Sequence, residues 1–260
     1  MGTITTAIIF TLFLWWFSTG LILYLDGLPR RTYAFSLAGA GAVAIGALGV
    51  MAVAGKDTGA AATYVGFTCA IIIWGWQEMA FLMGCISGRR REACPAGAGE
   101  WEKFLFATEA ILHHELALVA SMLLIYAATW QQPNQIGSQT FLLLWVMRLS
   151  AKLNLFLGVR NQYTNFLPPP LRYLASYFGK RPLNLLFPIS VTAASIMTFV
   201  LWQAALSPHA TADASAGMSL LATLLSLAVL EHWFLVLPLP VESMWRWALG
   251  SRGTVASAAK

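Results

Sequence analysis

Long apolar runs alternate with short polar or charged connections along the whole 260-residue chain. A helix needs about 20 mostly apolar residues to cross a lipid bilayer. Seven runs reach this length, and they cover residues 5–25, 33–54, 61–85, 103–129, 137–158, 185–206 and 216–238. The pattern therefore predicts an all-α protein, a polytopic bundle of about seven transmembrane helices that forms a single integral membrane domain over residues 1–260.

The basic residues follow a regular rhythm between these runs. Alternate connections and the C-terminal tail hold 13 of the 16 Lys and Arg residues: Arg30, Arg31, Arg89, Arg90, Arg91, Lys103, Arg160, Arg172, Lys180, Arg181, Arg246, Arg252 and Lys260. The intervening connections hold only Lys56. Because positively charged loops stay on the cytoplasmic side, we predict that the N-terminus lies outside and the C-terminus in the cytoplasm. An odd number of spans agrees with this orientation.

The composition supports a membrane protein and excludes several other classes. Hydrophobic residues make up 58% of the chain, charged residues only 10%, and the mean hydropathy is +0.67, whereas a soluble domain carries about 25% charged residues. The net charge of +5 belongs to cytoplasmic loops that face anionic lipid, and no segment resembles a nucleic-acid-binding module. The three cysteines form no CxxC pair and indicate no disulfide framework.

Two segments outside the runs are candidates for the membrane surface. Between residues 159 and 184, the residues that share one helical face are Leu171, Leu174, Tyr177 and Phe178. This pattern is typical of a short amphipathic helix at the cytoplasmic interface, or of an ordered loop. In the C-terminal tail, Trp245 and Trp247 suit the headgroup region, where tryptophan is enriched.

Ionisable residues inside the apolar runs are costly in lipid and usually face a bundle interior. Given the predicted orientation, several of them lie about 9–11 Å from the cytoplasmic end of their helices. This layer contains Glu78, Glu109, Lys152 and Glu231, with His232 beside them and His113 and Arg148 about one turn deeper. We therefore expect the third, fourth, fifth and seventh helices to share a polar interior in which opposite charges pair.

The stretch EAILHHELAL, residues 109–118, concentrates four of these polar groups. Glu109 and His113 are four residues apart and share a helical face, and we expect that face to point inward. Glu115 lies well away from Glu109 around the helix, so it is expected to face another helix or a partner protein.

The polar layer allows three chemical interpretations. In the first, buried ion pairs and histidine hydrogen bonds fix the register of the helices without any ligand. In the second, carboxylates and histidines hold a metal, as in the di-iron centres of helical bundles; the candidate ligands are Glu78, Glu109, His113, Glu231 and His232. Against the metal, the spacing is Glu-x-x-x-His and not the usual Glu-x-x-His, and no second such pair is present.

The third interpretation is a tetrapyrrole site, because neutral histidine in a membrane helix is a common axial ligand. The candidates are His113, His114 and His232, and the 11 tryptophans and 15 phenylalanines would suit such a pocket. Catalytic motifs are absent: there is no Gly-rich phosphate loop, no G-x-S-x-G and no H-E-x-x-H. The sequence therefore identifies no catalytic residue. It favours a non-enzymatic role, and an enzyme remains the alternative.

Several long motifs carry a family resemblance. They are WGWQEMAFLMGCISGRRR (74–91), HHELAL (113–118), WVMRLSAKLNLFLGVRN (145–161), LPPPLRYLASYF (167–178) and LEHWFLVLPLP (230–240). In this order they resemble putative photosynthetic complex assembly protein 2, the PuhE-type family of purple photosynthetic bacteria. The resemblance covers most of the chain from the third helix onward. It implies a multi-pass protein of the bacterial inner, or intracytoplasmic, membrane that is associated with production of the reaction centre and its light-harvesting antenna.

These observations lead to one hypothesis and one rival. In the hypothesis, the protein assists assembly of reaction-centre and light-harvesting subunits, and its polar layer holds bacteriochlorophyll or a precursor. His113 or His232 would lie near the magnesium, and Arg148 and Lys152 would neutralise buried glutamates or a pigment carboxylate. The rival is a membrane oxidoreductase with a Glu/His iron centre that acts on a pigment or quinone.

Overall fold

The computed structural model describes residues 2–249 and confirms the all-α architecture. The seven helices that are long and apolar enough to cross a membrane are α1 (Gly2–Asp26), α2 (Tyr33–Ala54), α3 (Ala60–Leu82), α4 (Glu100–Ala128), α5 (Ile136–Leu157), α6 (Leu186–Ala205) and α7 (Ala212–Phe234). Four short 3-10 helices lie in the connections: η1 (Arg30–Thr32), η2 (Thr164–Phe166), η3 (Pro169–Tyr177) and η4 (Val241–Trp245). No strand occurs within the described residues. The sequence predicts both the number and the order of the long helices correctly.

Two helices end three or more residues earlier than the apolar runs predict, each for a local reason. α3 stops at Leu82, three residues before the predicted end, because Gly84 adopts a left-handed conformation with φ +75°. A left-handed glycine commonly terminates a helix. α7 stops at Phe234, four residues early, and Pro238 and Pro240 follow it. Since a residue before proline disfavours the helical conformation, the apolar run continues there as an irregular chain.

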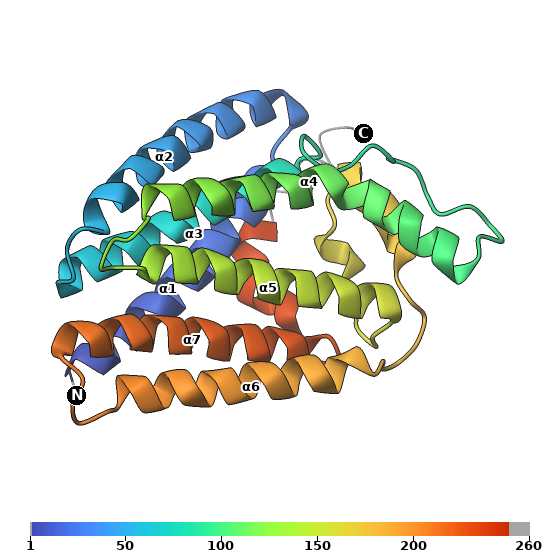
Figure 1. Cartoon of the computed structure of the whole chain (residues 1–260). Coiled ribbons are helices and arrows are strands. Elements are labelled where there is room, and N and C mark those ends of the chain that lie inside the picture. The colour runs from blue at the N-terminus through green and yellow to red at the C-terminus, as the bar shows by residue number, and fades with distance from the viewer. Residues whose placement is uncertain (1, 250–260) are drawn as a thin grey trace.

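α3 and α7 form the centre of the bundle. In the most apolar stretch of 18 residues, 61% of the residues are buried in each of these two helices, against 11–28% in the other five. α3 packs against α1, α2, α4, α5 and α7, and α7 also contacts α5 and α6. Figure 1 shows the long helices side by side, with the α6–α7 hairpin along one edge and α2 along the other. The peripheral helices expose large apolar side chains such as Phe13, Ile45, Leu123 and Phe199, as lipid-facing helices do.

α4 bends before its midpoint, as Figure 1 shows. The connection that follows α3 presses against the bend: the Ser87 carbonyl accepts a hydrogen bond from the His114 amide at 2.9 Å. A Cβ atom at Gly88 would overlap the backbone of Glu109 and Ala110, so only glycine permits this approach. Insertion of an outside group into the helical hydrogen-bond ladder is a recognised cause of such bends.

The expected interfacial helix is present but packs against protein. The segment forms the 3-10 helix η3, whose Leu171, Leu174 and Tyr177 are buried against Phe81 and Ala110. The Tyr177 hydroxyl accepts a hydrogen bond from Arg90 and donates one to the Glu92 carbonyl, both at 2.9 Å, and burial raises the pKa of this hydroxyl. η3 therefore closes one end of the bundle.

The two tail tryptophans behave differently from each other. Trp245 is buried, and its indole donates a hydrogen bond to the Trp16 carbonyl at 3.0 Å. The prediction that Trp245 lies among the lipid headgroups is therefore wrong. The tail folds back onto α1, which a sequence pattern of two tryptophans does not reveal. Trp247 is 47% exposed. The tail up to Leu249 therefore belongs to the folded bundle.

Candidate functional site

A buried ion pair joins the central helix to α5. Glu78 on α3 is only 7% exposed, and its Oε2 lies 2.9 Å from Nη2 of Arg148. Part of the Arg148 side chain remains open, at 38% exposure. Breaking such a pair by removing one partner leaves a charge without compensation in a low-dielectric environment. The pair therefore fixes α3 and α5 in register.

A second ion pair lies one helical turn along α5. Nζ of Lys152 is 2.6 Å from Oε1 of Glu115 on α4, and the Trp145 indole donates to the other oxygen of that carboxylate at 3.3 Å. Lys152 is also close enough to Glu78 to interact electrostatically with it. Because Arg148 and Lys152 share one face of α5, this helix supplies both cations of the layer.

His114 occupies the space between these two pairs. Its side chain is fully buried, and its Nε2 lies 3.5 Å from Oε1 of Glu78. The ring stacks on Phe81 with centroids 4.3 Å apart. Within the described residues, neither ring nitrogen has a hydrogen-bond partner. His114 thus fills the junction of α3 and α4 through its stacking on Phe81 and its contact with Glu78.

α7 and α1 contribute the other side of the layer. Oε1 of Glu231 accepts a hydrogen bond from the Trp15 indole at 2.8 Å, and Glu231 is an electrostatic neighbour of Arg148. His232 turns the other way: its Nδ1 lies 2.9 Å from the Ala228 carbonyl and its Nε2 lies 2.9 Å from the Ser150 hydroxyl. Since a carbonyl only accepts, Nδ1 carries the proton and Nε2 accepts from Ser150.

A cavity of about 380 Å³ opens beside this layer, between α1, α3, α5 and α7. Its polar wall consists mainly of Glu78, Arg148, Glu231 and His232. Most other lining residues are apolar, and the aromatic ones are Trp15, Trp74, Tyr163, Phe166, Phe178, Phe234 and Trp245. Cofactor sites usually combine an apolar wall with a few convergent polar groups, in volumes of about 300–1,000 Å³. This cavity has that character.

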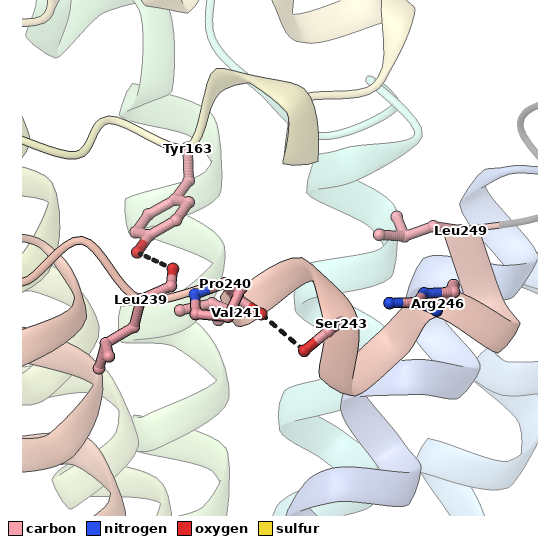
Figure 2. Close-up of a pocket in the computed structure, with 7 residues that line it drawn as sticks. All are labelled: Tyr163, Leu239, Pro240, Val241, Ser243, Arg246 and Leu249. Atoms are coloured by element: carbon pink, nitrogen blue, oxygen red, sulfur yellow. Dashed lines mark hydrogen bonds between the residues drawn. The ribbon is translucent and has the colours of Figure 1, made fainter.

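A more open cleft of about 580 Å³ adjoins the cavity at the end of the bundle. Tyr163 and Val241 line both spaces. Figure 2 shows the Tyr163 hydroxyl donating to the Leu239 carbonyl, at 3.3 Å, and Ser243 donating to the Pro240 carbonyl, at 2.7 Å. The cavity therefore meets the surface where the connection after α5 contacts the tail.

The predicted polar interior is confirmed, but α4 presents different residues to it. Glu109 and His113 are exposed, so the expectation that they face inward is wrong. His114 and Glu115 face α3 and α5 in their place. In the structure, Ala110, His114 and Leu118 form the buried stripe of α4 at a four-residue spacing, and the sequence offers the same spacing for Glu109 and His113.

The metal interpretation is not supported by this arrangement. Glu109 and His113 point away from the layer, so the five expected ligands do not come together. Within residues 2–249, no group of three or more His, Cys, Asp or Glu side chains is placed to hold a metal ion. Of the three histidines expected near a pigment, His113 is exposed, His114 is fully buried outside the cavity lining, and His232 lines the cavity.

Comparison with known proteins places the chain in a family. The sequence matches the family described as "Protein of unknown function (DUF3623)" over residues 1–256. The chain belongs to this family. A relative from Rhodobacter capsulatus, described as "Uncharacterized 30.4 kDa protein in puhA 5'region", is 40% identical over 245 residues, which cover 93% of this chain and 89% of the relative. No solved structure matches the fold.

Proposed function

We propose that this protein is a membrane-embedded assembly factor for the photosynthetic reaction centre and its light-harvesting complex. In this role it holds bacteriochlorophyll or a precursor in the cavity between α1, α3, α5 and α7, and transfers it to nascent subunits in the inner or intracytoplasmic membrane. The cavity is the observation that carries the proposal, because it combines apolar and aromatic walls with a few convergent polar groups, as ligand sites do.

The lining of the cavity supports a flat, aromatic ligand with a few polar groups. Trp15, Trp74 and Trp245 supply planar apolar surface, on which conjugated rings pack favourably. The open part of Arg148 supplies a donor for a ring carbonyl or carboxylate. The encoding of the relative in the puhA 5' region agrees with the resemblance of several motifs to photosynthetic complex assembly proteins.

The adjoining cleft supports transfer at the end of the bundle that carries the basic connections. Arg246 lines this cleft, and Arg89, Arg90 and Arg91 lie in the connection after α3. Such basic segments favour an anionic cytoplasmic leaflet. Pigment that leaves the cavity past Tyr163 would therefore meet apoprotein helices at that surface.

The experiment is to fill the cavity in a bacteriochlorophyll-producing host. Gly75 lines the cavity, and a Cβ atom there would meet only Ile22, at 3.6 Å. Gly75→Leu therefore adds a larger side chain at the cavity wall, at a position whose Cβ meets no backbone of another element, and Gly46→Leu on α2, where a Cβ meets open space, is the matched control. We expect the near-infrared bands of assembled complexes to fall in Gly75→Leu alone, at equal protein levels. Equal bands in both variants would contradict the proposal.

A further inference from the structure

The charges of the polar layer leave one carboxylate without a cation. Arg148 pairs with Glu78, and Lys152 pairs with Glu115. Within the described residues, Glu231 takes part in no ion pair within 4.0 Å, and its one hydrogen bond comes from the neutral indole of Trp15. A carboxylate in a low-dielectric setting requires a proton, a cation or a metal to balance it. Glu231 is thus the carboxylate of the layer that has no cation of its own, because Arg148, which acts on it from a longer distance, already pairs with Glu78.

The side chain of Glu231 lies at the wall of the cavity. The residue lines the cavity and is exposed, although α7 is a central helix. Trp15 holds Oε1 at 2.8 Å, which leaves Oε2 as the oxygen available to a ligand. Trp15 also lines the cavity, so an aromatic surface stands beside that oxygen.

The histidines are less available than Glu231. The lone pair of His232 on Nε2 is engaged by Ser150, and the ring is 2% exposed. His114 does not line the cavity, and His113 lies on the outer face of α4. Each would need a rearrangement before it could coordinate a metal inside the cavity.

Building on the proposed function, we propose that Glu231 is the axial ligand to the magnesium of a bacteriochlorin bound in the cavity. Magnesium is a hard cation that prefers oxygen ligands, and Oε2 of Glu231 is an open carboxylate oxygen. The indole of Trp15 orients the carboxylate through the other oxygen, as partners outside the coordination shell commonly do. The macrocycle would lie against the tryptophan surface of the cavity.

The test compares two probes on the full-length protein in mild detergent: bacteriochlorophyll, and bacteriopheophytin, which is the same ring without magnesium. The variant is Glu231→Leu, which keeps a side chain of similar volume and removes the ligand. We expect it to weaken binding of bacteriochlorophyll at least about tenfold, because even supporting groups around a metal are worth 10–100-fold. Its affinity for bacteriopheophytin should stay within about twofold, which also shows that the variant is folded.

The outcomes separate this inference from the function on which it rests. Wild-type protein should shift the bacteriochlorophyll absorption band that responds to an axial ligand, and Ser150→Ala, which frees the His232 ring, should leave that shift in place. The role of Glu231 would be overturned if Glu231→Leu lost affinity for both pigments to the same extent. It would also be overturned if the wild type bound both pigments with equal affinity. Neither result would contradict pigment binding itself. Failure of the wild type to bind either probe would overturn the proposed function itself.

Discussion

Arg148 on α5 holds Glu78 on α3 across a distance of 2.9 Å, Nη2 to Oε2. Glu78 is buried in the most enclosed part of the bundle, whereas the arginine remains partly open to the cavity. The pair therefore serves two purposes at once. It fixes the central helix against α5, and it places a cationic group on the wall of the cavity.

Removal of one partner from this pair should destabilise the protein. Arg148→Met leaves Glu78 buried without its cation, which costs about 3–5 kcal/mol in comparable buried pairs. The double variant Glu78→Gln, Arg148→Met should recover much of that loss, since no charge is then left alone. Chemical unfolding in detergent micelles measures the free energies. A double variant whose loss equals the sum of the two single losses would show that the two groups do not interact.

The neighbouring histidines of α4 should differ sharply. His114→Ala removes a fully buried ring that stacks on Phe81, and we expect a loss of about 2–4 kcal/mol, in the range of other core truncations. His113→Ala changes an exposed side chain and should stay within about 0.5 kcal/mol of the wild type. The same unfolding assay compares them, and the reverse order would mean that α4 is rotated relative to the structure described here.

The close approach at Gly88 gives a prediction about the bend in α4. Gly88→Ala would drive a methyl group into the backbone of Glu109 and Ala110, which cannot move aside as a side chain does. We expect the free energy of unfolding to fall by about 1–3 kcal/mol, which is the usual cost of overpacking. Gly46→Ala, in an open helical position, is the control and should be neutral or stabilising by up to about 1 kcal/mol. Equal stability of the two variants would show that the connection is not packed on α4.

The orientation in the membrane stays a prediction, and the cysteines can test it. Cys85 is exposed in the connection after α3, whereas Cys69 is buried in that helix. If basic connections are cytoplasmic, a membrane-impermeant maleimide should label Cys85 in inverted vesicles and not in intact spheroplasts. Cys85→Ser and Cys94→Ser variants assign the signal to a residue. Labelling in intact spheroplasts would reverse the topology.

The sequence predicts helices far better than helix faces in this protein. Apolar length alone locates all seven spans, because the bilayer imposes it. Which face of a helix points inward depends on packing: the connection through Ser87 and Gly88 lies against α4 at Ala110 and His114, and His114, not His113, is buried in the bundle. The pairing of Glu115 with Lys152 and the contact of Glu231 with Trp15 likewise join segments far apart in sequence. No local pattern specifies such contacts, and an adjacent pair such as HH leaves two faces about 100° apart equally plausible.

The central claim is that the cavity beside Arg148 and Glu231 holds a magnesium tetrapyrrole. The most direct measurement is one optical spectrum, with magnesium and iron content, of the full-length protein purified in mild detergent from a bacteriochlorophyll-producing cell. We predict a co-purified pigment band and about one magnesium per pigment, both reduced in Gly75→Leu and retained in Gly46→Leu. A colourless protein, or iron in place of pigment, would contradict the claim.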